Sequence, residues 1–394
     1  MNINGDPESE RAEVCGANAP PVRSMRLVIA GAGTGGHLFP GIAVAEELMH
    51  KAPESKVLFI TTGRQVEKTV LGEKPFETAS ITATGFKGVG LWRKLAAITV
   101  LPRGLFQSMG LLRRFSPDAV LGMGAYSSAP VVIAACLKGI PRFIHEQNRI
   151  AGITNRWLSG FAEKVFVSFK DTDMGCRADK IVYTGNPVRA EIRESLRAGI
   201  KKSQRGFEEP FTILVIGGSQ GAHSINKAVT EAFSFIENTR NFRVIHQTGT
   251  KDEQYVRRTY ESMGVDATVA SFFNDMASLY ESADLAVCRA GASTVAEIAA
   301  VGLPAFFIPF PHAADDHQTA NAEGLAAAGA AEIIDERNLS GGVLAGRFEA
   351  YRADPAKFEK LRAAAAAAGM PDSASLILDH MAVVLTAKQR AAKS

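Results

Sequence analysis

At 394 residues the chain is longer than one ordinary hydrophobic core supports, so we expect two domains. Its 46% hydrophobic and 22% charged content is typical of a globular protein. A net charge of +3 is too small to indicate nucleic acid as a partner. The four cysteines include no C-x-x-C pair, so no zinc site or disulfide framework is expected.

The first 24 residues are polar and include two consecutive prolines. They lack the apolar central region of a signal peptide, and no later stretch approaches the ~20 apolar residues that span a bilayer. We expect residues 1–24 to be a disordered extension and the fold to begin at Met25.

A phosphate-cradle pattern occurs twice. The sequence GAGTGGH at 31–37 follows an apolar run, and GGSQGA at 217–222 follows another. Glycines let the backbone approach a ligand closely, and the helix that follows presents unpaired N–H groups and a positive dipole end. The repeat predicts two α/β domains, each holding a diphosphate and facing a shared cleft.

Apolar runs alternate with helical segments along the whole chain, which predicts a doubly wound parallel sheet in each domain. The expected strands include 56–60, 119–122, 142–146, 164–167, 211–216, 242–247, 267–270, 284–287 and 305–308. The GNPVR segment at 185–189 marks the crossing between domains. We therefore expect domains at 25–187 and 188–370, and a last helix at about 372–388 that is free to pack back on the first domain.

The first glycine loop also matches the G-x-G-x-x-G dinucleotide fingerprint. No acidic residue follows about 20 residues on to hold a ribose, although Arg64 would suit a 2′-phosphate. An NADP site and a purely structural turn are therefore alternatives to a phosphate loop. His37 lies at the start of the next helix, whose positive end favours a neutral ring. It is a candidate general base or a simple ligand contact.

Polar side chains follow a buried strand of the first domain at His145, Glu146, Gln147 and Asn148. The carboxyl ends of parallel strands are where such folds bind ligands. Asp171 and Asp173 resemble a metal-binding D-x-D pair, but we interpret them as solvated surface.

In the second domain, Ser219 and Gln220 lie in the glycine loop and can hydrogen-bond phosphate or sugar. The segment 288–297 is again a strand, a turn of small residues and a helix. Glu297 in that helix can accept two hydrogen bonds from a ribose diol, or simply complement the helix dipole.

Residues 78–117 contain no acidic side chain, while cations alternate with large apolar groups. This composition favours contact with anionic lipid, the alternative being two core helices with solvated basic faces. The candidate membrane face comprises Lys87, Leu91, Trp92, Arg93, Lys94, Arg103 and Phe106.

Taken together, these motifs closely resemble the MurG-type UDP-GlcNAc transferases, a family of GT-B glycosyltransferases with two Rossmann-like domains. The resemblance covers about residues 25–388 and rests on GTGGH-x-x-P at 33–40, HEQN at 145–148, GNPVR at 185–189, GGSQGA at 217–222 and RAGA at 289–292, continuing through Glu297. Ala32 stands where the family often has another glycine.

The resemblance implies that the second domain holds UDP-GlcNAc. Phe273 would lie beside the uracil, Glu297 on the ribose diol, and Gln318 on the sugar, while Ser219 and Gln220 would contact diphosphate or sugar. The full set of implied donor-site residues is Thr34, Gly35, Gly36, Asn148, Arg189, Ser219, Gln220, Phe273, Ala292, Ser293, Thr294, Val295, Ala296, Glu297 and Gln318.

The resemblance also implies an inverting β-1,4 transfer of GlcNAc to undecaprenyl-pyrophosphoryl-MurNAc-pentapeptide in peptidoglycan biosynthesis, with no obligatory metal or other cofactor. The protein would then sit peripherally on the cytoplasmic face of the bacterial inner membrane and serve cell-wall growth, cell shape and division. The alternatives are a UDP-GlcNAc epimerase of the same fold and a membrane-bound scaffold whose partners are other cell-wall or division proteins.

Overall fold

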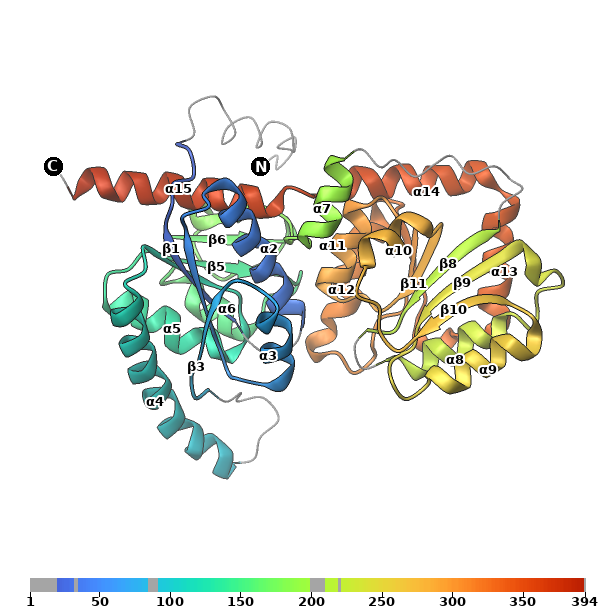
Figure 1. Ribbon diagram of the computed structural model, residues 1–394, viewed down its shortest axis with the longest axis horizontal. Coiled ribbons are helices and arrows are strands. Elements are labelled where there is room, and N and C mark those ends of the chain that lie inside the picture. The colour runs from blue at the N-terminus through green and yellow to red at the C-terminus, as the bar shows by residue number, and fades with distance from the viewer. Residues whose placement is uncertain (1–19, 32–34, 84–90, 199–209, 219–220, 393–394) are drawn as a thin grey trace. The chain divides into compact units, whose positions relative to one another are not determined.

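The computed structural model describes residues 20–31, 35–83, 91–198, 210–218 and 221–392. The chain forms two compact units (Figure 1). The first comprises Met1–Arg189 with Asp372–Ser394, and the second comprises Ala190–Pro371. The units therefore divide after Arg189 and again after Pro371, close to the boundaries expected at 187 and 370.

A seven-stranded parallel sheet forms the centre of the first unit, in the order β3-β2-β1-β4-β5-β6-β7. Its strands are β1 (Arg26–Ala30), β2 (Lys56–Thr61), β3 (Glu77–Ser80), β4 (Ala119–Gly122), β5 (Arg142–Glu146), β6 (Lys164–Val167) and β7 (Ile181–Tyr183). The chain moves outward from β1 to β3 and then returns to the other side of β1 with β4. The carboxyl ends of β1 and β4 therefore form a topological switch point, where open α/β sheets bind ligands.

The inner strands β1, β2, β4, β5 and β6 are buried on both faces because helices cover each side, whereas the edge strands β3 and β7 are partly exposed. Alternate residues point to opposite faces, so Leu27 and Ile29 belong to one core cluster while Val28 and Ala30 belong to another. The first cluster includes side chains of α2 and α15, and the second includes side chains of α4, α5 and α6. The helices of this unit are α2 (Gly35–Lys51), α3 (Gln65–Gly72), α4 (Leu91–Phe115), α5 (Ala125–Leu137), α6 (Ile153–Ser159) and α15 (Ser373–Ala391).

The last helix, α15, returns to the first unit and packs beside α2. Ile377, Leu378 and Met381 are fully buried in the same core cluster as the strands. An ion pair of 2.7 Å between Lys51 and Asp379 joins the ends of the two helices. The chain terminus therefore completes one face of the first sheet.

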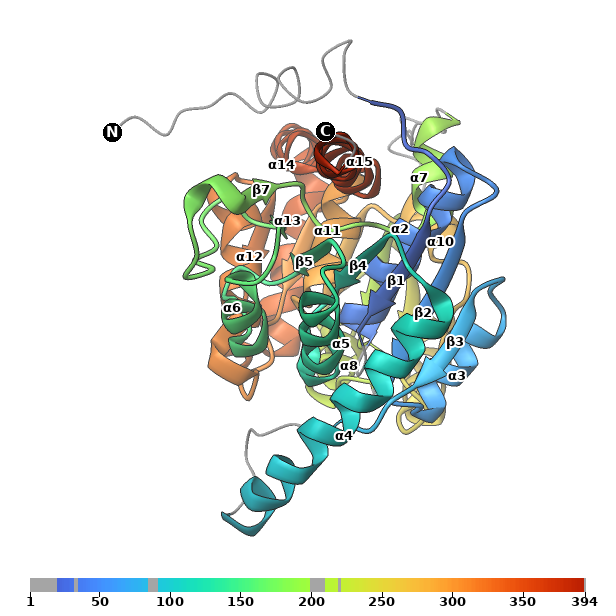
Figure 2. The same ribbon diagram turned by 90° about the vertical axis from the view of Figure 1, so that its left-hand side faces the viewer.

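The segment rich in cations and apolar groups forms one helix, α4, rather than two core helices. Its C-terminal half packs against α5 and buries Leu112 and Phe115, while its N-terminal end extends away from the sheet (Figures 1 and 2). Leu101, Arg103 and Phe106 are exposed, and the Phe106 side chain is 74% exposed.

A six-stranded parallel sheet forms the centre of the second unit, in the order β10-β9-β8-β11-β12-β13. Its strands are β8 (Phe211–Ile216), β9 (Phe242–Gln247), β10 (Asp266–Ala270), β11 (Leu285–Cys288), β12 (Ala305–Phe307) and β13 (Ala331–Ile333). The order again changes direction beside the strand that precedes the glycine loop, so β8 and β11 form the second switch point. The two parallel sheets confirm the expected pair of Rossmann-like units.

Eight helices surround this sheet in the described part of the second unit: α7 (Ala190–Arg197), α8 (His223–Ala232), α9 (Glu253–Met263), α10 (Met276–Ser282), α11 (Ala292–Ala300), α12 (His317–Ala327), α13 (Gly341–Ala353) and α14 (Pro355–Ala368). Phe233, Phe242, Tyr260 and Phe348 form an aromatic cluster between β9 and helices α8, α9 and α13. Across the described residues of both units, the helices are too short or too polar to cross a bilayer.

Candidate functional site

The first glycine loop leaves the sheet at the switch point between β1 and β4. A Cβ atom on Gly31 would lie 2.8 Å from the Cβ of Met123, so the backbone passes too close for any other residue. Gly35 and Gly36 open α2 and are half-buried. Thr34 lies outside the described residues. The close packing of Gly31 against Met123 therefore requires a glycine where the loop leaves β1.

His37 lies in the first turn of α2 and is half-buried. Its Nδ1 is 2.9 Å from Oε1 of Gln147, which follows β5. Nε2 of Gln147 donates to the carbonyl of Met123 over 2.9 Å. The structure thus brings together two residues that the sequence placed at the ends of different strands.

His145 is fully buried at the end of β5, and its Nε2 is 3.1 Å from the carbonyl oxygen of Gly185. Burial lowers the pKa of His145 from 6.5 to about 4, because a charged ring would lose its hydration. His145 is therefore a neutral part of the scaffold behind His37.

Glu146 holds the loop after β5 in place rather than facing a ligand. Its carboxylate accepts hydrogen bonds from the backbone of Asn148 and Gly152 and from the side chain of Asn155, at 3.0, 3.1 and 2.8 Å. Asn148 is half-buried at the same strand end. Of these two, Asn148 remains the candidate for ligand contact.

Arg189 ends the first unit, and its guanidinium carbon lies 5.4 Å from the centre of the Phe39 ring on α2. This cation–π contact places Arg189 beside the helix that carries His37. Arg189 and Phe39 are separated by about 150 positions in the sequence, so no local pattern indicates that they are close together.

Asp171 and Asp173, the D-x-D pair, form surface ion pairs. Asp171 is 2.5 Å from Arg149, and Asp173 is 3.1 Å from Arg156. Their carboxylates are engaged by arginines, as expected for solvated surface.

The second glycine loop follows β8 with the same close packing. A Cβ on Gly217 would lie 2.8 Å from the backbone nitrogen of Ala222, and one on Gly221 would lie 2.5 Å from the Thr248 carbonyl. Gly221 also has a φ of +78°. Ser219 and Gln220 lie outside the described residues.

A second helix N-terminus follows β11, where Gly291 caps α11. Val295 donates its N–H to the Gly291 carbonyl over 2.9 Å and buries its side chain, so it is the first residue of the helical ladder. The preceding N–H groups, at 292–294, belong to the helix start, where donors have no intrahelical partner. The Ser293 hydroxyl is buried with no hydrogen-bond partner among the described residues. Ala292, Ser293 and Thr294 therefore form a concentrated set of donors.

Glu297 is 4% exposed and is the sixth residue of α11. Its Oε2 accepts a hydrogen bond of 3.0 Å from the Tyr280 hydroxyl on α10. The structure thus shows a buried carboxylate held by a tyrosine that the sequence did not single out. A surface glutamate that only complements the helix dipole would be exposed, so the burial favours a more specific role.

Phe273 and Gln318 are each tied to a neighbouring loop. The Phe273 N–H donates to Oε1 of Gln247 at the end of β9, over 3.2 Å. Gln318 Oε1 accepts from the Phe310 N–H over 3.0 Å, which leaves its amide nitrogen as the donor end. Both residues follow parallel strands or begin a helix in the second unit, as their predicted roles require.

Arg289 organises this region, although sequence reasoning assigned it no role. Its guanidinium donates to the carbonyls of Ile308 and Pro309, each at 3.1 Å, and pairs with Glu336. It also reaches the Ser224 hydroxyl on α8 at 3.1 Å. Its sequence signals were its position between a buried strand and a turn of small residues and its place as the first residue of the RAGA motif.

His246 lies fully buried on β9 beneath the second glycine loop. Its ring nitrogens are 2.9 Å from the Tyr260 hydroxyl and 3.0 Å from Oδ1 of Asn226. Asn226 in turn donates to the Thr248 carbonyl, so its oxygen faces the histidine. Burial lowers the pKa of His246 from 6.5 to about 3.

This burial predicts a pH-dependent stability. The unfolded chain binds a proton at His246 near pH 6.5, whereas the folded chain does so only near pH 3. The contribution is therefore complete above pH 6.5 and is lost as the pH falls, by about 1.4 kcal/mol per pH unit. Urea unfolding between pH 7 and pH 4 should show a shallower decline in His246→Gln, which cannot titrate there, than in the natural protein. Equal slopes would contradict the burial of a neutral ring.

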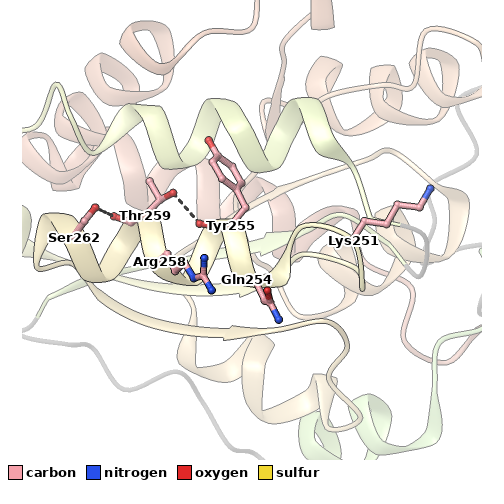
Figure 3. Close-up of a pocket in the computed structure, with 6 residues that line it drawn as sticks. All are labelled: Lys251, Gln254, Tyr255, Arg258, Thr259 and Ser262. Carbon is pink, nitrogen blue, oxygen red and sulfur yellow. Dashed lines mark hydrogen bonds between the residues drawn. The ribbon is translucent and has the colours of Figure 1, made fainter.

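One hollow in the described surface of the second unit is lined by residues that sequence analysis did not single out. It measures about 590 Å³ and runs along the exposed side of α9 (Figure 3). Its lining consists of Lys251, Gln254, Tyr255, Arg258, Thr259 and Ser262. The hydroxyls of Thr259 and Ser262 donate to carbonyls of the helix itself, each at 2.8 Å, so they are not presented to a ligand. The convergent donors at the strand ends make a better candidate site.

The sequence matches two family models: the glycosyltransferase family 28 N-terminal domain over residues 27–167 and the C-terminal domain over residues 212–377. A protein of Geobacter metallireducens is 44% identical over 367 residues, which is 93% of this chain and 100% of that protein. One of Geotalea uraniireducens is 46% identical, covering 91% of this chain and 98% of its own length. Both are named UDP-N-acetylglucosamine--N-acetylmuramyl-(pentapeptide) pyrophosphoryl-undecaprenol N-acetylglucosamine transferase.

Among solved structures, the crystal structure of Acinetobacter baumannii MurG matches with a TM-score of 0.72 and 32% identity, covering 90% of this chain and 98% of that one. A UDP-GlcNAc 2-epimerase from Neisseria meningitidis matches with a TM-score of 0.60 and 13% identity, over 91% of this chain and 99% of that one. At that identity the epimerase shares the fold alone.

Proposed function

Because this chain belongs to glycosyltransferase family 28, among its MurG-type members, we propose that it transfers GlcNAc from UDP-GlcNAc to the 4-hydroxyl of MurNAc in undecaprenyl-pyrophosphoryl-MurNAc-pentapeptide. This is the lipid I to lipid II step of peptidoglycan biosynthesis. The observation that carries the proposal is an identity of 44–46% to transferases of that name over more than nine-tenths of the chain. The relatives with epimerase activity are distant by comparison.

The reaction is one displacement with inversion. The acceptor hydroxyl oxygen attacks the anomeric carbon of GlcNAc, the bond to the UDP oxygen breaks, and a β-1,4 bond forms. The hydroxyl proton moves to Nε2 of His37, which acts as the general base. The hydrogen bond between Nδ1 of His37 and Gln147 supports this assignment, because it leaves Nε2 for the substrate.

The departing diphosphate gains negative charge, which hydrogen-bond donors of the protein must stabilise. We assign this role to the start of α11, at Ala292, Ser293 and Thr294, together with the second glycine loop and its Ser219 and Gln220. Preorganised N–H groups at a helix N-terminus stabilise such charge without a divalent metal or another cofactor. The buried Ser293 hydroxyl supports this assignment.

The remaining contacts with UDP-GlcNAc are assigned to residues of the second unit. Glu297 accepts both ribose hydroxyls, Phe273 lies against the uracil, and Gln318 donates to the GlcNAc hydroxyls, with Val295 and Ala296 completing the helix around them. On the first unit, Thr34, Gly35 and Gly36 face the acceptor diphosphate and the transferred sugar. Asn148 and Arg189 reach the donor from the same unit.

The acceptor carries a lipid, and we propose that α4 and the segment before it meet the membrane surface. Arg103 and Phe106 are exposed on a helix whose N-terminal end extends away from its sheet (Figure 2). Lys87 and the side chains of Leu91, Trp92, Arg93 and Lys94 lie outside the described residues. The protein would thus act peripherally at the cytoplasmic face of the inner membrane, where other cell-wall and division proteins are available as partners.

Charge reversal tests this face. Changing Lys87, Arg93, Lys94 and Arg103 to glutamate should abolish sedimentation with anionic vesicles at low salt, because each cation near the surface contributes ~1 kcal/mol. A matched control reverses four exposed cations of the second unit, Arg240, Lys251, Arg258 and Lys360, and should leave sedimentation unchanged. Equal vesicle binding by both variants would refute the membrane role of α4.

The reaction itself is tested by transfer of labelled GlcNAc from UDP-GlcNAc to a short-chain analogue of the lipid acceptor. A disaccharide product with equimolar UDP is the expected result. Isomerisation of UDP-GlcNAc without acceptor would point to an epimerase. Tight binding of UDP-GlcNAc without turnover would point to a scaffold.

A further inference from the structure

A chain of hydrogen bonds runs behind His37 through the core of the first unit. It begins at the Gly185 carbonyl, 3.1 Å from Nε2 of His145. It continues from Nδ1 of His145 to Nε2 of Gln147, 3.1 Å apart, and then from Oε1 of Gln147 to Nδ1 of His37 over 2.9 Å. His145 and Gln147 are 0% and 1% exposed, so water does not compete for these groups.

The proton positions in this series of hydrogen bonds follow from the backbone carbonyls at its two ends, which can only accept. The Met123 carbonyl can only accept, so the end of Gln147 that lies 2.9 Å from it must be the amide nitrogen. The other end of Gln147 is then the oxygen, which can only accept from His37. The Nδ1 atom of His37 must therefore carry the proton.

The Gly185 end of the series independently gives the same orientation of the Gln147 amide. The Gly185 carbonyl can only accept, so Nε2 of His145 carries a proton and its Nδ1 accepts from Gln147. This requires a neutral His145 ring, and burial lowers the pKa of His145 to about 4. Gln147 Nε2 also lies 3.4 Å from the His145 carbonyl, a longer contact that again requires an amide nitrogen at this end. Both carbonyl ends therefore impose one orientation on the Gln147 amide.

We propose that Gln147 is a positioning residue that fixes His37 as the Nδ1–H tautomer, so that Nε2 holds the lone pair that accepts the hydroxyl proton. His145 and the Gly185 carbonyl lock Gln147 in that orientation. The proposal deepens the function proposed above and rests on it for its catalytic consequence. The wrong tautomer would present an N–H to the hydroxyl and could not take its proton, a defect that costs histidine-dependent enzymes several orders of magnitude in rate.

A neutral amide in this position has a chemical consequence of its own. A carboxylate hydrogen-bonded to Nδ1 would add a negative charge beside the ring and favour its imidazolium form. The Gln147 amide orients the ring without adding that charge. A carboxylate would also lack the protons that Gln147 donates to Met123 and His145.

The tautomer is measured directly from the ¹⁵N chemical shifts of protein labelled at the histidine ring nitrogens, with the His37 signals assigned by their loss in His37→Ala. The natural protein should show a protonated Nδ1 and an unprotonated Nε2 at His37 at neutral pH. In Gln147→Leu the signals should move toward the Nε2–H form, which free histidine favours. Its kcat should fall ~10-fold to 100-fold, less than a locked wrong tautomer would cost, because the released ring still samples the Nδ1–H form, and UDP-GlcNAc binding should be nearly unchanged.

Ser159→Ala is the matched control, because it removes a buried hydroxyl of the same unit that bonds only to backbone carbonyls. It should change neither the tautomer nor kcat. An Nε2–H signal at His37 in the natural protein would overturn the proposal without any variant. An unchanged tautomer in folded Gln147→Leu would overturn it as well. Full activity in His37→Ala would instead remove the base role while the tautomer result stood, so the two failures are distinguishable.

Discussion

Replacing His37 with alanine should lower kcat for GlcNAc transfer by ~100-fold or more, because the acceptor hydroxyl would lose its general base. Affinity for UDP-GlcNAc should stay within a few-fold, since the donor contacts assigned above lie mainly on the second unit. The ring is half-buried in the first turn of α2, with Nδ1 engaged by Gln147. Steady-state transfer assays and calorimetric binding of UDP-GlcNAc separate these two quantities.

His50 provides a matched control, because it lies in the last turn of the same helix and is exposed. His50→Ala should transfer GlcNAc at the natural rate. If His37→Ala did so too, the proton would have to leave by another group, and the mechanism proposed here would be wrong in its base.

Replacing Glu297 with alanine should raise KM for UDP-GlcNAc by ~100-fold or more while kcat changes less. Two hydrogen bonds from the ribose hydroxyls to a carboxylate would be lost, and bonds to charged groups contribute about 1.5–3 kcal/mol each. The effect falls on KM because the ribose is bound in the ground state and the transition state alike. Glu297 is buried and already held by the Tyr280 hydroxyl, so the carboxylate is preorganised for the diol.

Two further variants define the specificity of this effect. Tyr280→Phe removes the 3.0 Å bond to Glu297 while keeping the ring and should raise KM a few-fold. Glu349→Ala removes an exposed glutamate from α13 of the same unit and should leave KM unchanged. A normal KM in folded Glu297→Ala would exclude the ribose role and leave Glu297 as a structural partner of Tyr280.

The alternation of apolar runs and glycine turns predicted the fold correctly because its signal is local. Each strand from β1 to β12 that sequence analysis anticipated is a short apolar run, and burial on both faces of a parallel sheet demands such runs. Helix α2 begins at Gly35, so His37 lies in its first turn as expected. Edge strands β3, β7 and β13 were missed, β3 and β13 because they are short and only partly apolar, and β7 because it has only three residues.

Some residues of the candidate sites could also be identified from the local sequence, and others only from tertiary contacts. Glycines 31, 217 and 221, His37 and Glu297 were identified from neighbours in the sequence. The structure places Gly31 and Gly217 directly after strands, His37 in the first turn of α2 and Glu297 within α11, while their chemical roles stay predictions. The function of Glu146 as a brace for Asn155, and of Arg289 as a link to Ser224, depended on contacts that sequence spacing does not encode.

The sequence by itself determined the two α/β units, their glycine loops and the family, because these depend on local periodicity, backbone conformation and short motifs. Tertiary structure decided the orientation of His37, since Gln147 lies 110 residues away and meets it only when β1 and β5 enter one sheet. It also decided that α4 is one helix with a buried end and an exposed Phe106, because a mixed apolar and basic composition is compatible with either a core or a surface. Residues far apart in the chain acquire a common function only through the strand order that places their ends side by side.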